Sequence, residues 1–326
     1  MQGQEATELI SIAKSSIGID VSKDWLDVHV SPSGDLFRVG NDKAGIAALK
    51  RRLARFEIAC VALEPTGKWH RQLWRSLVAS RIPAVVVDPY RVRMFAKAKG
   101  ILAKTDKLDA RVLSSFAAVM GPARRPPPSE AVDAIAELVT ARESAVAEQT
   151  RLKNQRAAAT LSFLDVQFEE RLQYIAGVIA ALEQEIERSV KAKPELSERY
   201  AILLSIPGIG PVTAATLIGC LSELGSLTDK EITMLAGLAP IADQSGQRDG
   251  KRSVRGGRSH IRRALYCAAL SAARYNKPLR AFYTHLTDNG KAAKCALIAV
   301  ARKLLLLAST LLAQNRKWQP IAPKAA

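Results

Sequence analysis

The stretch S-I-G-I-D-V-S-K-D-W-L-D-V-H-V, from Ser16 to Val30, decides the fold. Two short β-prone runs flank a polar turn, which predicts a β-hairpin, and residues 37–39 favour a third strand. Two continuous apolar runs follow, Ile58–Leu63 and Pro83–Val87, and such runs are typical of buried strands. Each of these is preceded by a stretch with helical spacing. Strands that alternate with helices predict an α/β sheet covered on both faces.

Helical patterns account for most of the remaining chain. They cover residues 42–56, 66–80, 105–120 with Thr105 as the N-cap, 130–193 as an antiparallel pair broken near 162–165, and most of the chain after 198, where Gly-rich turns interrupt at 207–211 and 239–257. The stretch G-P-A-R-R-P-P-P-S cannot form regular structure and marks a domain boundary. The expected division is a tail (1–15), an α/β domain (16–120), a Pro-rich linker (121–129), an all-α hairpin (130–197), a mainly helical C-terminal domain (198–318) and a tail (319–326).

The charge of the chain predicts a polyanionic partner. Its 326 residues carry 48 Lys and Arg against 31 Asp and Glu, a net charge of +17. Between residues 241 and 303 the excess reaches +11, from 14 Lys and Arg against 3 acids. Clustering of this kind favours nucleic acid, with an anionic membrane surface as the second choice. A composition of 48% hydrophobic and 24% charged residues excludes a mainly disordered chain.

The same sequence argues against a membrane-bound or secreted protein. The apolar run at 296–313 carries Arg302 and Lys303 at its centre, and each would cost about 2.5–3.5 kcal/mol in a bilayer. It therefore predicts a buried helix. The four cysteines show no C-x-x-C spacing, and residues 1–14 lack the apolar core of a signal peptide. We expect a cytoplasmic protein, associated with the bacterial nucleoid when active.

Four carboxylates are candidates for a catalytic site. Asp20 interrupts an apolar strand, and Glu64 ends another. Asp106 and Asp109 fall three residues apart, on one face of a helix. Each has an ordinary explanation as a solvent-facing, capping or helix N-terminal acid. Together they form an oxygen-only ligand set that suits Mg²⁺ or Mn²⁺, and a pair of such ions about 4 Å apart promotes phosphoryl transfer. Strands with acids in this arrangement are typical of ribonuclease-H-like nucleases.

The C-terminal half holds two further candidate phosphate sites. Gly208 and Gly210, in S-I-P-G-I-G-P, lie between two helices, as in helix-hairpin-helix DNA contacts or in an ordinary tight connection. Ser245 precedes a basic segment and is a candidate nucleophile toward phosphate, although on spacing alone a polar loop residue is the better explanation. The candidate phosphate-binding cations are Arg248, Lys251, Arg252, Arg255, Arg258, Arg262 and Arg263.

Five motifs occur in order: G-I-D-V-S at 18–22, L-E-P-T-G at 63–67, K-T-D-K-L-D-A at 104–110, I-P-G-I-G at 206–210 and Q-S-G at 244–246. In this set the chain resembles the DEDD transposases of the insertion sequence 110 family, relatives of the pilin-gene DNA invertases. The resemblance implies a ribonuclease-H-like (RuvC-like) domain, a dimerising helical linker and a C-terminal transposase domain. It also implies Mg²⁺ held by Asp20, Glu64, Asp106 and Asp109, with Ser245 forming a covalent phosphoserine link to DNA. The active site would combine two subunits, and a non-coding guide RNA would pair with donor and target DNA.

We therefore expect a DNA transposase or site-specific recombinase that acts as a homodimer, or as a tetramer on DNA. Ser253 and Ser259 stay open as alternative nucleophiles, because the segment after Ser245 is rich in Gly, Ser and Arg. One alternative function is a RuvC-like metal-dependent nuclease, a junction resolvase that uses water as the nucleophile. Another is a non-enzymatic helix-hairpin-helix DNA-binding protein, which leaves the four carboxylates unexplained.

Overall fold

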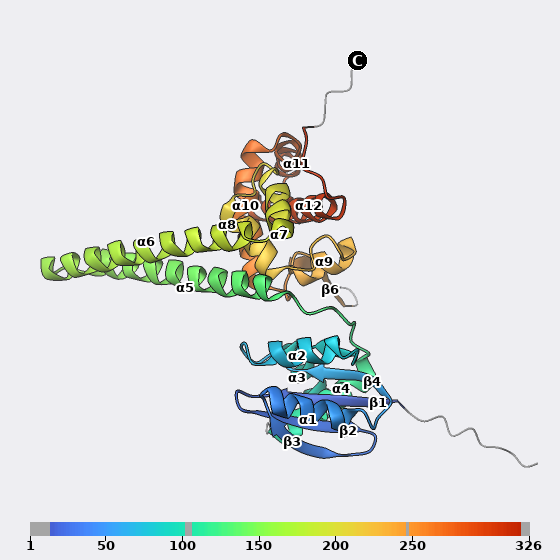
Figure 1. Ribbon diagram of the computed structural model, residues 1–326. Helices are drawn as coiled ribbons and strands as arrows, with labels where there is room; N and C mark the ends of the chain where they lie inside the picture. The colour runs from blue at the N-terminus through green and yellow to red at the C-terminus, as the bar shows by residue number, and fades with distance from the viewer. Residues whose placement is uncertain (1–13, 102–105, 246–247, 321–326) are drawn as a thin grey trace, which may run out of the picture. The chain divides into compact units, whose positions relative to one another are not determined.

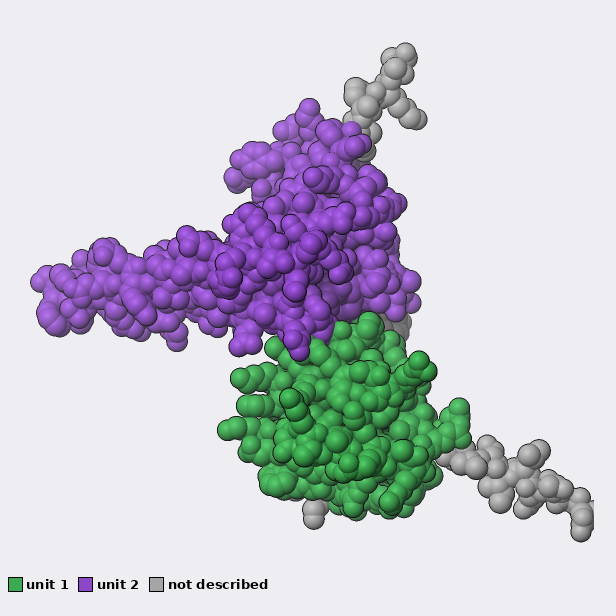
Figure 2. Space-filling view, viewed as in Figure 1, with its two compact units in different colours: residues 1–127 green, residues 128–326 purple. Residues whose placement is uncertain are grey.

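The computed structural model describes residues 14–101, 106–245 and 248–320 of the chain. The chain divides into two compact units, unit 1 (residues 1–127) and unit 2 (residues 128–326), which Figure 2 colours separately. The division falls inside the proline-rich stretch, where the chain has no regular secondary structure.

Unit 1 is built on a mixed sheet. Its described strands are β1 (Ser15–Val21), β2 (Trp25–Ser31), β3 (Leu36–Gly40), β4 (Ile58–Leu63) and β5 (Ala84–Val86). They are ordered β3-β2-β1-β4-β5; β2 is antiparallel to β1 and β3, and β4 and β5 are parallel to β1. The predicted hairpin, third strand and two buried strands are therefore present.

Helices cover both faces of this sheet, because apolar residues alternate between the two sides of each strand. On one face Ile17, Ile19 and Leu63 pack against α1 (Lys43–Leu53) and α2 (His70–Ala79). On the other face Ala62 and Val85 pack against α3 (Pro89–Ala98) and α4 (Asp106–Met120). We call this second side the α4 face. The arrangement is the covered α/β sheet that the sequence predicts (Figure 1).

Two helices of unit 1 differ from the pattern read from the sequence. Helix α2 begins at His70 rather than at residue 66, because the chain turns at Gly67, whose φ is +47°. Helix α3 occupies a stretch that the sequence showed only as basic. Its N-terminus is well formed, since Pro89 is in the first turn and the Asp88 side chain accepts a hydrogen bond from the Tyr90 amide.

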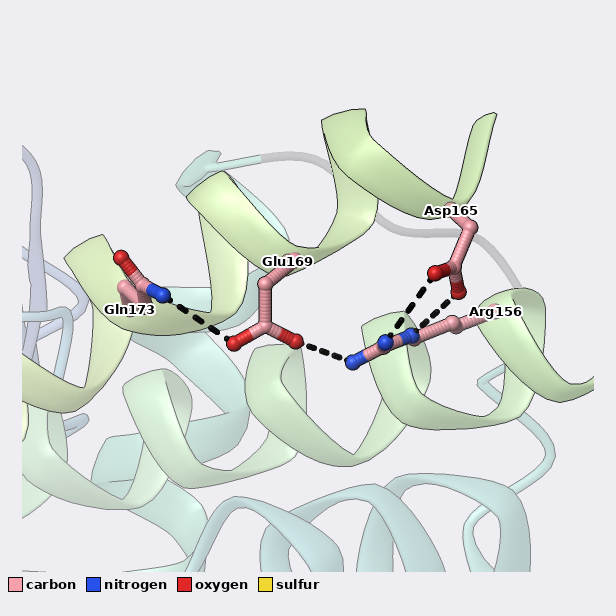
Figure 3. Close-up of polar contacts among 4 residues, drawn as sticks. All are labelled: Arg156, Asp165, Glu169 and Gln173. Carbon is pink, nitrogen blue, oxygen red and sulfur yellow. Dashed lines mark hydrogen bonds and ion pairs between the residues drawn. The ribbon is translucent and has the colours of Figure 1, made fainter. Parts of the chain in front are cut away.

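Unit 2 begins with a long antiparallel helical hairpin, α5 (Glu130–Ala158) and α6 (Ser162–Lys191), which projects from the rest of the unit (Figure 1). Ser129 caps α5 by accepting a hydrogen bond from the Val132 amide. Near the tip, Arg156 of α5 joins two acids of α6 (Figure 3): its Nε donates to Asp165 at 2.6 Å, and its Nη1 donates to Glu169. This ion pairing fixes the register of the two helices where they meet.

The remainder of unit 2 is mainly helical, as expected. Its helices are α7 (Pro194–Leu204), α8 (Pro211–Cys220), α9 (Asp229–Leu235), α10 (Ser259–Tyr275), α11 (Lys277–Asp288) and α12 (Ala293–Ala313). Among the described helices, α12 alone is long and apolar enough to cross a membrane, and 56% of its most apolar stretch is buried inside the protein. It contributes Val300, Leu304 and Leu311 to the core of the unit, which explains the apolar run.

The Gly-rich turn expected at residues 239–257 is wrong. This segment forms an antiparallel ribbon of β6 (Pro240–Ser245) and β7 (Arg248–Val254), in which Ile241 pairs with Ser253 and Ser245 pairs with Arg248. The dense cations and glycines of β7 carry no apolar alternation, so the strand leaves no periodic signal in the sequence.

Candidate functional site

Asp20 lies on the α4 face of the sheet. It is two residues from Gly18 on β1, so the two residues share a side. Gly18 is where α4 crosses β1, because a Cβ atom there would collide with the Ala110 carbonyl oxygen and the Ser114 amide nitrogen. Only glycine permits this close approach, and it brings α4 directly over the strand that carries Asp20.

Glu64 occupies the matching position on the neighbouring strand. Ile19 of β1 pairs with Leu63 of β4 in parallel register, so Asp20 and Glu64 are the next residues along two strands about 4.8 Å apart. Glu64 also lies two residues beyond Ala62, which packs on the α4 face. Both carboxylates are partly buried. The structure therefore brings these two predicted acids side by side at the carboxyl ends of parallel strands.

The other two predicted acids belong to the helix that covers this face. Asp109 immediately precedes Ala110, the residue of α4 that contacts Gly18. Asp106 begins α4, and its side chain lies outside the described residues. Among the side chains that the structure describes, no three His, Cys, Asp or Glu residues converge on a common point.

Asp27 is a fifth carboxylate on this face that the sequence analysis missed. It pairs directly with Asp20 across β1 and β2 and is only 6% exposed. Arg38, opposite it on β3, donates two hydrogen bonds to its carboxylate, from Nε at 3.0 Å and from Nη2 at 2.7 Å. The guanidinium compensates the charge of Asp27 beside Asp20. The sequence feature that could have revealed Asp27 is the turn at residues 22–24, because its length sets the register of the hairpin and so the pairing of Asp27 with Asp20.

A partly buried polar pair fastens α4 to the sheet. Nδ1 of His29 on β2 lies 2.7 Å from Oγ of Ser114, which itself donates to the Arg111 carbonyl oxygen at 2.9 Å. Since the hydroxyl proton is used, Nδ1 of His29 is the donor to Ser114. Burial, followed by the nearby charge of Arg111, lowers the pKa of His29. The neutral imidazole therefore fixes α4 over the strands that carry the acids.

Ser245 is the last residue of β6 in unit 2, and it pairs with Arg248, the first residue of the cationic strand β7. Its side chain lies outside what the structure describes, as do those of Arg248 and Lys251. The alternative nucleophiles occupy other places: Ser253 is exposed on β7, and Ser259 is the first residue of α10.

Three of the predicted phosphate-binding cations contact protein groups in this structure. Arg258 donates to both carboxylate oxygens of Glu223, at 2.7 and 2.8 Å, and to the Cys220 carbonyl oxygen. Nη1 of Arg262 donates to the Gly256 carbonyl oxygen at 2.8 Å, and Nη2 of Arg263 donates to Glu143 Oε2 at 3.0 Å. Among the predicted cations whose side chains the structure describes, Arg252, Arg255 and Arg263 are exposed.

The two glycines of the predicted phosphate hairpin differ in their surroundings. Gly208 has a φ of +109°, and a Cβ atom there would lie 2.5 Å from Cβ of Ala272 in α10. Close helix packing therefore explains this glycine. Gly210 is exposed, with nothing near the position of a Cβ atom, and it precedes the first residue of α8. Of the two glycines, Gly210 is the one with open space around it next to a helix N-terminus.

Comparison with known proteins shows which family this chain resembles. Residues 17–163 match the DEDD transposase domain of IS110 elements, and residues 200–284 match the domain described as Transposase IS116/IS110/IS902 family. The chain is 27% identical to the pilin gene-inverting protein of Moraxella bovis over 320 residues, which covers 94% of this chain and 98% of that protein. The corresponding Moraxella lacunata protein is equally similar. The IS110 insertion element protein of Streptomyces coelicolor is 30% identical over 44% of this chain and 35% of that protein.

These matches define the class of the protein, which is an enzyme of DNA recombination. More specifically, the chain belongs to the IS110/IS116/IS902 family of transposases.

Proposed function

We propose that the chain cuts and rejoins DNA strands by phosphoryl transfer at the α4 face of unit 1, through a covalent link between DNA and Ser245. The observation that carries this proposal is the adjacency of Asp20 and Glu64 on parallel strands, directly under a helix that carries two more acids. The strand order β3-β2-β1-β4-β5, in which β2 is antiparallel to β1 and β3 while β1, β4 and β5 are parallel, supports a ribonuclease-H-like assignment for unit 1.

The donor set fits a hard divalent cation. Asp20, Glu64, Asp106 and Asp109 offer only carboxylate oxygens, which Mg²⁺ prefers and Mn²⁺ accepts. When bound, such an ion polarises a phosphoryl oxygen and stabilises charge on attacking and leaving oxygens. Arg38 pairs with Asp27, and by the family resemblance Asp20 and Glu64 are the strand-borne ligands.

The proposed nucleophile acts from the end of β6. Ser245 Oγ attacks the phosphorus, its proton leaves to a base or to solvent, and the bond to one sugar oxygen breaks as that oxygen takes up a proton. Reversal by another strand's hydroxyl restores a phosphodiester without ATP, since the covalent link conserves the bond energy. The exposed Arg252 and Arg255 on the cationic side of the ribbon would offset charge on DNA.

Acids and serine lie in different units, and by family resemblance they come from different subunits of a homodimer. The same resemblance supports a guide RNA that pairs with donor and target DNA. The concentration of charge in unit 2, without a described base-reading motif, supports recognition of nucleic acid through phosphates.

The decisive assay mixes the protein with DNA from the ends of its own element, the adjoining RNA and Mg²⁺, and separates the products on a denaturing gel. We expect a covalent protein–DNA band that Asp20→Asn and Ser245→Ala abolish, while Ser253→Ala and Ser259→Ala retain it. Cleaved DNA without any covalent band would instead favour the metal-dependent nuclease with water as the nucleophile. DNA binding without cleavage under all conditions would favour the non-enzymatic alternative.

A further inference from the structure

Two loops leave the sheet beside Asp20 and Glu64 and are tied to each other. The β1–β2 turn (22–24) follows Asp20 by one residue, and the β4–α2 loop (65–69) follows Glu64 directly. Nδ2 of Asn41 donates to the Ser22 carbonyl oxygen at 2.8 Å and to the Trp69 carbonyl oxygen at 3.3 Å. One side chain therefore holds both loops at the edge where the proposed catalytic acids lie.

Trp25 stands on the same side of the sheet as the acids. It is two residues before Asp27 on β2, so it shares the α4 face, one step nearer the turn. Its position is fixed, because its amide donates to Ser22 Oγ at 3.0 Å and its carbonyl accepts from that hydroxyl at 2.9 Å. Yet the side chain is 51% exposed. An exposed indole on a fixed stretch of backbone, beside the proposed catalytic acids, is a platform for a planar ligand group.

Two lysines surround the second tryptophan of these loops. Nζ of Lys23 lies 6.0 Å and Nζ of Lys68 lies 5.3 Å from the centroid of the Trp69 ring. The ring itself packs against the core between the sheet and helices α1 and α2, at the same end of the strands as Trp25 but on the other side of the sheet, and it holds two cations that come from different loops. We call Lys23, Trp25, Lys68 and Trp69 the loop cluster.

We propose that the loop cluster binds a single DNA strand next to the phosphate that is cut, with an unpaired base stacked on Trp25 and phosphates held by Lys23 and Lys68. The inference rests on the proposed function, because it takes the adjacent acids as the cleavage site. It adds a binding site with its own chemistry: an indole face for the base and two ammonium groups for the backbone.

The aromatic platform is what favours an unpaired strand over intact duplex. Bases within a duplex already stack on each other, and only a displaced or unpaired base exposes its face to a side chain. Phosphates alone would require the lysines but not an exposed indole. Stacking also depends little on which base is present, so it suits an enzyme whose target sequence is selected by other contacts or by a guide RNA.

The test measures binding of a fluorescent single-stranded DNA oligonucleotide to the intact protein, with Mg²⁺ removed so that cleavage cannot occur. The Trp25 variants are compared at high salt, which weakens all phosphate contacts and so leaves stacking as the larger part of the binding, and the lysine variants are compared over a series of salt concentrations. Trp25→Ala is expected to weaken binding about 5- to 100-fold, the range for loss of one stacked base, whereas Trp25→Phe retains most of it. The matched control is Tyr174→Ala, on α6, which removes an aromatic ring that is 75% exposed. The double change Lys23→Gln with Lys68→Gln should lower the salt slope, unlike Lys43→Gln on α1.

Several results would overturn the proposal. Equal losses from Trp25→Ala and Tyr174→Ala would mean nonspecific contact, and unchanged binding by Trp25→Ala would exclude the platform. A loss confined to RNA of the same sequence would identify a different ligand. A failure of the proposed function can be told apart from a failure of the loop-cluster proposal. Asp20→Asn should still bind the oligonucleotide. Weaker binding by Trp25→Ala would support the loop cluster even if no covalent product ever forms.

Discussion

Arg258 and Arg255 lie three residues apart in the basic segment, yet the structure predicts opposite consequences for their removal. Arg258 is 33% exposed in its side chain and Glu223 is 16% exposed, and they share two hydrogen bonds, with a third to the Cys220 carbonyl oxygen. Breaking a fully buried pair costs about 3–5 kcal/mol and an exposed one at most about 1 kcal/mol. For this half-buried pair we expect Arg258→Ala to lower the free energy of unfolding by about 2 kcal/mol.

The assay compares melting temperature and the salt dependence of DNA binding for both variants. In a unit of about 200 residues, a loss of about 2 kcal/mol corresponds to a fall in Tm of about 4–8 °C. Arg258→Ala should show this fall with an unchanged salt slope. Arg255→Ala should keep the wild-type Tm and reduce the slope of log K against log salt by about 0.9. If Arg258→Ala keeps its Tm and flattens the slope as Arg255→Ala does, the salt-bridge assignment is refuted.

Three further predictions follow from the packing and the acids. Asp20→Asn or Glu64→Gln should abolish strand cleavage and leave the circular dichroism spectrum unchanged, because each removes a ligand charge rather than core volume. Gly208→Ala should lower the free energy of unfolding by about 1–3 kcal/mol in denaturant titration, because its Cβ atom meets α10 and its φ is +109°, whereas Gly210→Ala should cost less than about 1 kcal/mol. Burial lowers the folded-state pKa of His29 below its unfolded value, so its contribution to stability is complete above about pH 6.5 and falls as the pH drops toward the folded pKa; His29→Gln should reduce this dependence.

Each of these predictions has a contrary outcome. Wild-type cleavage rates in both acid variants would exclude a role for the strand-borne carboxylates. Equal stability of the two glycine variants would mean that the close approach to α10 is absent in solution. If His29→Gln does not change the slope of stability against pH, His29 is not the source of that slope. His260, whose pKa is also lowered by burial, would then be the source.

The sequence was sufficient to predict the features that depend only on residues close together in the chain. Asp20 inside an apolar strand and Glu64 at a strand end both lie where their flanking residues predicted, because alternation fixes the face and strand length fixes the end. Helix α5 likewise begins at the residue after a capping serine.

It was insufficient where partners are distant along the chain. Arg258 finds Glu223, 35 residues earlier, and no local pattern encodes that pairing. The role of Asp27 depended on strand register, and the ribbon β6–β7 on pairing between strands that are individually irregular. Contacts of this kind are set by tertiary packing, so they emerge only from the folded chain.

Ser245 is the residue that we expect to carry the covalent link to DNA, and digestion with trypsin separates the three candidate serines into different peptides. Cleavage after Lys and Arg places Ser245 in the peptide 231–248 as its only serine, Ser253 in 253–255 and Ser259 in 259–262. Trapped protein–DNA complex, digested with nuclease and trypsin, should yield a phosphonucleotide adduct on peptide 231–248, localised to Ser245 by fragmentation in mass spectrometry. An adduct on peptide 253–255 or 259–262, with 231–248 unmodified, would contradict the account.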